Sequence, residues 1–350
     1  MWTECKVFKN DLAYITNVDY IRWEKLMNKV VLVTGGTGLL GYYFINALLY
    51  KNLIDKYNIK ILAIVRDLKK ANKLFFEVPE DIKKNLIFIK GDIEHLKCID
   101  GRIDYIFHAA SPTSSDFFIN QPVETIKTSV IGTINVFELA LKKNICGVLY
   151  LSSMEIYGQH NQETLLHEDE VVNLKPFNLR DCYPITKCMN ENLALSYSKE
   201  YSLPVNSVRL SQVIGTVVPP LESTDSRLII ELAKNVILQK DMVLKTRGES
   251  RRTYVYIADA ITAALAILTS NSTGEVYNVS DENTYCSVYE LCENVINYFG
   301  NEKIKVKIQE RNTNKYPDTN YLKLDSSKLR NLGWKPSKNI VEMFKCLISM

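Results

Sequence analysis

The segment VVLVTGGTGLLG, residues 30–41, constrains the fold more than any other feature of the sequence. An apolar run leads into a glycine-rich turn, and LLGYYFINALLY then continues with helical spacing. Gly35, Gly38 and Gly41 suit a tight turn, a close approach of backbone to pyrophosphate, and close packing of helix on sheet. The strand-turn-helix context therefore predicts a dinucleotide-binding βα unit rather than a merely structural turn. The expected cofactor contacts in this turn are Gly35, Thr37, Gly38, Leu39, Leu40 and Gly41.

Further short apolar runs alternate with helix-like segments along the chain. The runs are KILAIVRD, NLIFIKGD, YIFHAAS, GVLYLSS and PVNSVRLS. Such alternation predicts an α/β fold with a doubly wound parallel sheet. We expect a cofactor-binding domain at residues 29–212 and, at 213–350, mainly a smaller substrate-binding lobe interleaved with it.

Residues 1–28 precede the first strand and contain the amphipathic stretch DLAYITNVDYIRWEKL. We interpret this segment as an accessory element. It forms either a helix packed on the surface of its own domain or a contact between subunits.

The composition excludes several classes of protein. The 43 basic and 40 acidic residues nearly balance, which argues against a general nucleic-acid or membrane binder. The eight cysteines show neither a CxxC pair nor the Cys/His spacing of a zinc site, so we predict reduced thiols and no metal. Without a long apolar run or a signal-peptide pattern, a cytoplasmic location is expected.

The ends of the second and third predicted strands bear on the choice of cofactor. Arg66 stands where a carboxylate would hold the ribose of NAD, and an arginine there favours the 2′-phosphate of NADP(H). Alternatively, Arg66 is a solvated charge and Asp67 binds the ribose of NAD(H). Asp92 and Ile93 end the third strand and are expected either to meet the adenine or to form a surface turn.

A second group of residues is expected to catalyse the reaction. Tyr183 and Lys187 lie four residues apart in a helical pattern, so one face of the helix presents both. The ammonium is expected to lower the pKa of the phenol, which then exchanges a proton with a carbonyl or alcohol, and Lys187 is also expected to reach the nicotinamide ribose of the cofactor. Ser153, at the end of an earlier strand, is expected to hydrogen-bond the reacting oxygen.

With the glycine turn, HAAS at 108–111 and YxxxK in this order, the chain resembles the extended short-chain dehydrogenase/reductases over residues 29–340. The resemblance implies a Rossmann fold, a nucleotide-sugar substrate, and dimerisation through helices near 124–143 and 184–201. It assigns Arg252 to the substrate diphosphate, with a solvated strand charge as the alternative. Asp259 and the LGWKP ending at Pro336 also match. The chain departs from the family pattern at Ser129 and Gln212, where relatives often carry asparagine. The further contacts implied are Ala109, Ala110 and Ser111 to cofactor, and Ser153 and Gln212 to substrate.

The residues after Ser153 guide the choice of reaction. Met154 stands where related dehydratases carry a proton-donating aspartate, while Glu155 keeps their glutamate; a buried carboxylate bonded to backbone amides is the alternative role of Glu155. Because Arg66 favours NADPH, we expect reduction of a keto group on a nucleotide-activated sugar. The residues around these motifs resemble those of reductases that convert CDP-fructose to CDP-mannitol for surface polysaccharides. The alternatives are an NAD-dependent epimerase, a UDP-glucuronate decarboxylase or dehydratase, and a non-catalytic redox sensor.

Overall fold

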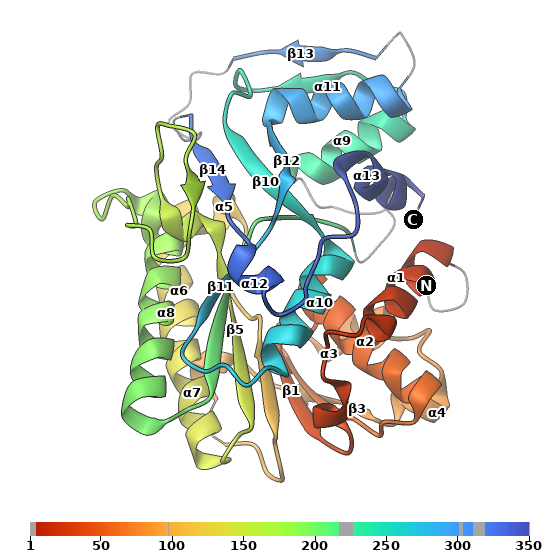
Figure 1. Ribbon diagram of the computed structural model, residues 1–350, viewed down its shortest axis with the longest axis vertical. Helices are drawn as coiled ribbons and strands as arrows, with labels where there is room; N and C mark the ends of the chain where they lie inside the picture. The colour runs from red at the N-terminus through yellow and green to blue at the C-terminus, as the bar shows by residue number, and fades with distance from the viewer. Residues whose placement is uncertain (1–4, 97, 217–226, 301–303, 311–318, 350) are drawn as a thin grey trace.

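The computed structural model describes residues 5–96, 98–216, 227–300, 304–310 and 319–349, so the first four residues of the predicted N-terminal extension lie outside it. Figure 1 shows a large lobe built on a central sheet and a smaller lobe above it. The large sheet has seven parallel strands in the order β11-β7-β5-β4-β1-β2-β3. Their bounds are β1 (Val30–Thr34), β2 (Lys60–Val65), β3 (Leu86–Lys90), β4 (Tyr105–His108), β5 (Gly147–Ser153), β7 (Val205–Leu210) and β11 (Val276–Val279).

This strand order confirms the predicted doubly wound sheet. From β1 the chain builds outward first to β2 and β3, and then on the other side to β4, β5 and β7. The central strands are buried on both faces, which explains why β1 reads as the unbroken apolar run VVLVT. The order reverses between β1 and β4, and ligands of such sheets bind in the crevice at that point.

Helices cover both faces of the large sheet. One apolar core lies between the sheet and helices α2 and α10, and a second contains residues of α7 and α8. The helices are α1 (Lys6–Asn17), α2 (Leu39–Asp55), α3 (Leu68–Leu74), α4 (Glu80–Lys83), α5 (Ser115–Asn120), α6 (Pro122–Ile126), α7 (Gly132–Lys142), α8 (Cys182–Tyr201), α9 (Leu228–Ile237), α10 (Ile257–Leu268), α11 (Val288–Phe299), α12 (Ser327–Arg330) and α13 (Ile340–Ile348). Short helical turns are η1 (Trp23–Leu26), η2 (Ile93–His95), the π-helical η3 (Lys127–Ile131), η4 (Met154–Tyr157) and η5 (Leu179–Asp181).

The smaller lobe is interleaved with the larger one. Its main sheet runs β12-β10-β14-β6 with β8 beside β10, and β13 pairs with β9. These strands are β6 (Leu165–Leu166), β8 (Gln212–Ile214), β9 (Met242–Leu244), β10 (Arg251–Tyr256), β12 (Asp281–Ser287), β13 (Val306–Ile308) and β14 (Tyr321–Leu324). Although α10 and β11 follow Gln212, they lie in the large lobe, and β6 reaches the small sheet from the first half of the chain. The chain thus crosses between the lobes several times.

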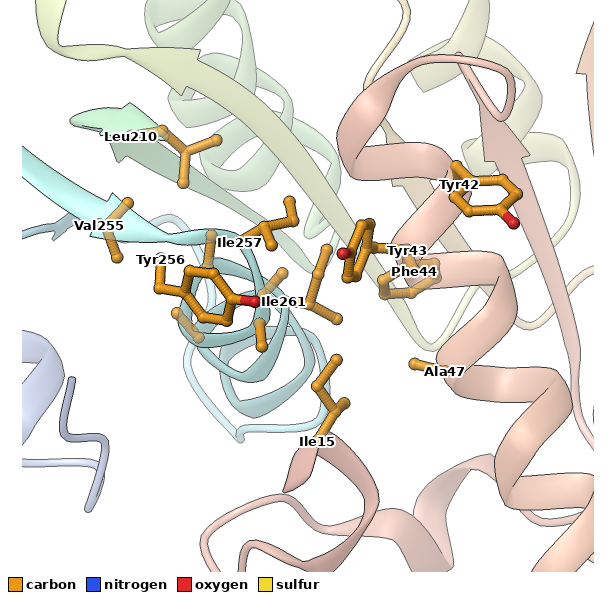
Figure 2. Close-up of a cluster of buried hydrophobic side chains, with 14 of the residues drawn as sticks. Ile15, Tyr42, Tyr43, Phe44, Ala47, Leu210, Val255, Tyr256, Ile257 and Ile261 are labelled. Carbon is orange, nitrogen blue, oxygen red and sulfur yellow. The ribbon is translucent and has the colours of Figure 1, made fainter. Parts of the chain in front are cut away.

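The N-terminal segment is part of the core. Helix α1 contacts α2 and α10, and its residues Phe8, Leu12 and Ile15 are at most 1% exposed. Figure 2 shows Ile15 directed at the side chains of these two helices, with Ile261 nearby on α10. The hydroxyl of Tyr256 donates a hydrogen bond of 2.7 Å to the carboxylate of Asp11. This segment therefore packs on its own domain, which is the first of the two alternatives predicted for it.

All eight cysteines are free thiols, which agrees with the prediction of reduced cysteines. Among the described helices, none combines the length and the apolar character that crossing a membrane requires.

Candidate active site

The glycine turn joins β1 to α2 at the crevice of the sheet. Gly35 has φ +72°, and a Cβ there would lie 2.8 Å from the backbone of Ala109. A Cβ on Gly41 would lie 2.3 Å from the carbonyl oxygen of Gly35, so neither position tolerates a side chain. Gly38 is the N-cap of α2 without a side-chain cap, and it is exposed. The free N–H groups of this helix end are suited to a phosphate.

The other predicted residues of the turn lie around that helix end. Thr37, Leu39 and Leu40 are half-buried, and Leu39 and Leu40 begin α2. Their backbone amides therefore share the uncapped first turn with Gly38.

The end of β2 presents one unpaired cation. Asp67 accepts hydrogen bonds from the amides of Lys69 (2.8 Å) and Lys70 (3.1 Å), so its carboxylate caps α3. Arg66 is exposed and has no ion pair among the described residues. Both side chains are exposed at this strand end, and Arg66 is the one without a hydrogen bond or ion pair among the described residues.

The end of β3 differs between its two predicted contacts. Asp92 is half-buried and accepts a hydrogen bond from the amide of Glu94, which caps η2. Ile93 is 4% exposed, and a Cβ on Gly132 would lie 2.4 Å from its Cδ1. The side chain of Ile93 is therefore a core contact, which leaves Asp92 and the backbone to face a ligand.

A buried polar relay fixes the end of β4 beside the glycine turn. The hydroxyl of Thr34 lies 2.7 Å from Nδ1 of His108, and Nε2 of the same ring lies 3.1 Å from the hydroxyl of Thr133. Burial lowers the pKa of His108 to about 3, so the imidazole is neutral. Thr34 also accepts a hydrogen bond from the amide of Ala110. Ala109, Ala110 and Ser111 are half-buried there. The sequence reasoning missed Thr34 and Thr133, and no motif marks them.

Lys187 is buried beneath the tyrosines. Its Nζ donates a hydrogen bond of 2.6 Å to the carbonyl of Leu151 and lies 4.9 Å and 5.6 Å from the ring centroids of Tyr150 and Tyr183. Burial lowers the pKa of Lys187 to about 7, partly offset by the charge of Glu191. The ammonium is therefore close to its titration point at neutral pH.

The pKa of Tyr183 corrects one expectation. Burial raises this pKa above its ordinary value, a hydrogen bond with Ser153 lowers it in part, and the charge of Glu155 raises it further. The expected lowering by Lys187 was wrong for this structure, because desolvation of the phenol dominates and the ammonium is directed at Leu151. The structure does bring Tyr183, Ser153 and Lys187 together.

Glu155 and Met154 point in different directions. Met154 is 3% exposed and belongs to an apolar cluster with Ile156 and Leu324, so it does not occupy the proton donor's place in the site. Glu155 is exposed, and its amide donates to the hydroxyl of Ser153. The alternative of a buried carboxylate bonded to backbone amides was wrong. Glu155 keeps a solvated carboxylate beside Tyr183.

Ser129 occupies the position at which relatives often carry asparagine. Ser129 lies in the π-helical turn η3, a distortion that occurs often at functional sites. Its carbonyl accepts hydrogen bonds from Asn190 (3.0 Å) and Thr133 (2.6 Å). Asn190 also donates to the hydroxyl of Tyr150, while its own Oδ1 is buried without a partner. Asn190 was missed, although its place three residues after Lys187 puts it on the same helix face.

The small lobe supplies a free cation and an amide. Arg251 is paired with Glu163 at 3.2 Å and with Glu290 at 2.9 Å. The neighbouring Arg252 has a buried Nε without a hydrogen-bond partner among the described residues. Gln212 of β8 pairs with Tyr254 of β10, two residues after Arg252, and the pairing of β10 with β12 is irregular between Arg252 and Tyr254.

The strand register relates Gln212 to the strand that carries Ser153. Ser153 of β5 lies opposite Leu210 of β7, and Gln212 follows two residues later. The carboxyl ends of these parallel strands meet at one edge of the sheet. Gln212 therefore follows the edge at which Ser153 lies, whereas Arg252 belongs to the sheet of the small lobe.

The residues near the C-terminus that match the family pattern have a structural role. The indole of Trp334 donates to the carbonyl of Asp259, and the amide of Ser337 donates to its carboxylate. Asp259 thereby fastens the LGWKP segment to α10. These residues explain part of the family pattern without touching the site.

Comparison with known proteins supports the assignment of a family. The model of the NAD dependent epimerase/dehydratase family matches residues 31–280. UDP-glucuronic acid decarboxylase 3 of Arabidopsis thaliana is 28% identical over 90% of this chain and 86% of its own length.

Two solved structures share the fold. A dTDP-glucose 4,6-dehydratase from Streptomyces venezuelae, with NAD bound, has a TM-score of 0.71 at 22% identity and covers 91% of this chain and 96% of its own. A UDP-N-acetylglucosamine 4-epimerase from Methanobrevibacter ruminantium has a TM-score of 0.73 at 21% identity, covering 92% of this chain and 98% of its own. With the family model spanning most of its length, the chain belongs to the NAD dependent epimerase/dehydratase family, whose members are nucleotide-sugar-modifying enzymes of the oxidoreductase type.

Proposed function

We propose that this enzyme oxidises a nucleotide-linked sugar, removes its carboxylate as carbon dioxide, and reduces the sugar again within one turnover. The likeness to UDP-glucuronic acid decarboxylases over 90% of the chain favours a UDP-linked uronic acid as substrate. The observation that carries the proposal is the exposed carboxylate of Glu155 beside the Ser153–Tyr183 pair. A simple reduction has no need of this second acid-base group.

The residues at the sheet edge fit a bound nicotinamide cofactor. The uncapped end of α2 and the close glycine contacts suit its pyrophosphate, and Lys187 would hold its ribose. When bound, the cofactor supplies reversible hydride acceptance at the sugar carbon.

The side chains divide the remaining work. Tyr183 acts here as its phenolate, the minor form given its raised pKa: the phenolate takes the proton of the sugar hydroxyl as the hydride leaves, and Ser153 orients that oxygen. The resulting ketone lies beta to the carboxylate, so the electron pair of the breaking carbon–carbon bond moves into an enolate as carbon dioxide departs. Glu155 then relays a proton from solvent water to the carbon, in place of the departed carbon dioxide, and Tyr183 returns its proton to the oxygen when the ketone is reduced. Arg252 and Gln212 hold the diphosphate.

The test is incubation of the purified enzyme with carboxyl-labelled UDP-glucuronic acid and a trace of NAD. We expect release of labelled carbon dioxide and a UDP-pentose by mass analysis, without lasting reduction of the cofactor. The variant Glu155→Gln should still oxidise the sugar but form the pentose slowly. If the enzyme epimerised the sugar without releasing carbon dioxide, the proposed decarboxylation would be wrong and the enzyme would be an epimerase.

A second candidate, an NADPH-dependent keto-sugar reductase, is favoured by Arg66. Arg66 is unpaired, whereas Asp67 is committed to capping α3, and this arrangement suits a 2′-phosphate. A reductase would consume NADPH in proportion to product with a nucleotide-linked ketose such as CDP-fructose. Comparing the two nicotinamide cofactors in both assays separates the candidates.

A further inference from the structure

The ring of Tyr183 has a stacked partner from another part of the chain. The rings of Phe118 in α5 and Tyr183 in α8 lie with centroids 4.4 Å apart and an angle of 7° between their planes. Both side chains are buried, at 7% and 9% exposure. Parallel stacking at this distance fixes the plane of the phenol as well as covering it.

This contact stands apart from the main cores of the molecule. Phe118, Cys182 and Tyr183 form an apolar cluster of their own among the described residues. The thiol of Cys182 lies 3.7 Å from the carbonyl oxygen of Phe118, so backbone and ring are both attached to the start of α8. Phe118 is therefore the apolar ring that determines how the Tyr183 side chain lies.

We infer that Phe118 is a positioning residue for Tyr183, and that it aligns the phenol oxygen with Ser153 and the reacting sugar carbon. Tyr183 is the second residue of α8 and follows the short helical turn η5. Proton transfer requires a correctly aligned phenol, and a displacement of about 1 Å costs roughly a hundredfold in rate. The segment leading to α5 also begins at Ala109–Ser111, beside the glycine turn, so one connection borders both the cofactor and the proton donor.

Kinetics test this role, which rests on the proposed function. Phe118→Leu should lower kcat about tenfold while leaving KM for the sugar nucleotide within about twofold, because the residue acts through Tyr183. Phe118→Tyr keeps the stacked ring and should restore kcat to within about twofold of the wild type. Phe117→Leu, the same change in the neighbouring half-buried residue, is the matched control and should behave as the wild type. A Phe118→Leu enzyme with normal kcat, or with a raised KM alone, would overturn the inference.

A spectroscopic measurement decides the matter even if no sugar nucleotide is turned over, an outcome that would refute the proposed function instead. A fluorotyrosine at position 183 should give a narrow fluorine resonance displaced by the ring current of Phe118. The variant Phe118→Leu should move that resonance toward the free value and alter its width, while Phe117→Leu should not. A resonance that is the same in all three proteins would show that Phe118 does not fix the phenol. Melting temperatures of the variants establish that each is folded.

Discussion

Tyr183 is the residue whose loss distinguishes an enzyme from a redox sensor. In Tyr183→Phe the ring and its stacking on Phe118 remain, but the exchangeable proton is gone. We expect turnover to fall by about 10²–10⁴-fold, the usual contribution of a positioned acid-base group. Cofactor binding, measured by fluorescence titration, should be unchanged. Unaltered function in this variant would favour the sensor.

Two adjacent arginines allow a matched comparison. Arg252→Met removes the unpaired cation of the small lobe, so KM for the sugar nucleotide should rise about tenfold to a hundredfold, the value of one charge-assisted contact. Arg251→Met breaks the ion pairs with Glu163 and Glu290 instead, and should leave KM within about twofold. Steady-state kinetics on both variants give the result. Equal KM values would remove Arg252 from the substrate site.

Single residues also show where sequence reasoning ends. The YxxxK spacing sufficed to predict that Tyr183 and Lys187 share a helix face, because helical period is a local property. It did not predict the raised pKa of Tyr183 or the stacking of Phe118, because burial depends on segments remote in sequence. Likewise, the sequence does not distinguish Arg251 from Arg252, because both side chains are positively charged. The structure distinguishes them, because carboxylates pair with Arg251.

At the scale of elements, the glycine turn makes a steric prediction. Gly41→Ala would force a methyl group to 2.3 Å from the carbonyl of Gly35, so the turn must open and cofactor affinity should fall at least tenfold. Gly91→Ala is the control, since its nearest neighbour, Ile64, lies at 3.8 Å. Titration of the cofactor with each variant measures this. Normal affinity in Gly41→Ala would mean that the pyrophosphate is bound elsewhere.

The alternation of strands and helices predicted the large sheet, but it did not predict which segments cross between the two lobes. Repeated βα alternation is local and identifies β1 to β5 and β7, whereas β11 and β6 are short and receive their place from their neighbours in the sheet. For the same reason a boundary at Gln212 describes the chain order better than the spatial division. A contact across 110 residues, such as the hydrogen bond that the amide of Asn278 donates to the side chain of Glu168, has no signature in a single sequence.

A contact between the N-terminal helix and the centre of the molecule weakens as pH rises. Burial raises the pKa of Asp11 from 3.8 to about 7. Between these values the folded chain holds a proton that the unfolded chain has lost, so the stabilisation present at low pH disappears as pH rises towards 7. Asp11→Asn keeps a hydrogen-bond acceptor for Tyr256 without this loss.

We expect the free energy of unfolding of Asp11→Asn, relative to the wild type, to increase by roughly 2 kcal/mol between about pH 5 and pH 8. Urea unfolding followed by tryptophan fluorescence at both pH values measures the difference. A constant difference would show that Asp11 titrates normally.

The assembly of whole molecules remains a proposal built on exposed apolar residues. These side chains gather on α6, η3 and α8: Val123, Ile126, Ile131, Met189, Leu195 and Tyr201. We propose that two copies associate through these helices, as the sequence resemblance implies. Met189→Glu should halve the mass measured by light scattering, whereas Phe76→Glu, at an apolar site that is more exposed and lies in another part of the chain, should not.

The burial of α1 bears on how the chain is made. The hydrogen bond from Tyr256 to Asp11 joins residues 245 positions apart, and α10 supplies much of the surface on which Ile15 lies. During synthesis α1 can therefore meet α2 early, but its contact with α10 must wait until residues 257–268 have left the ribosome. The packing of α1 is completed late, by a segment made about 240 residues after it.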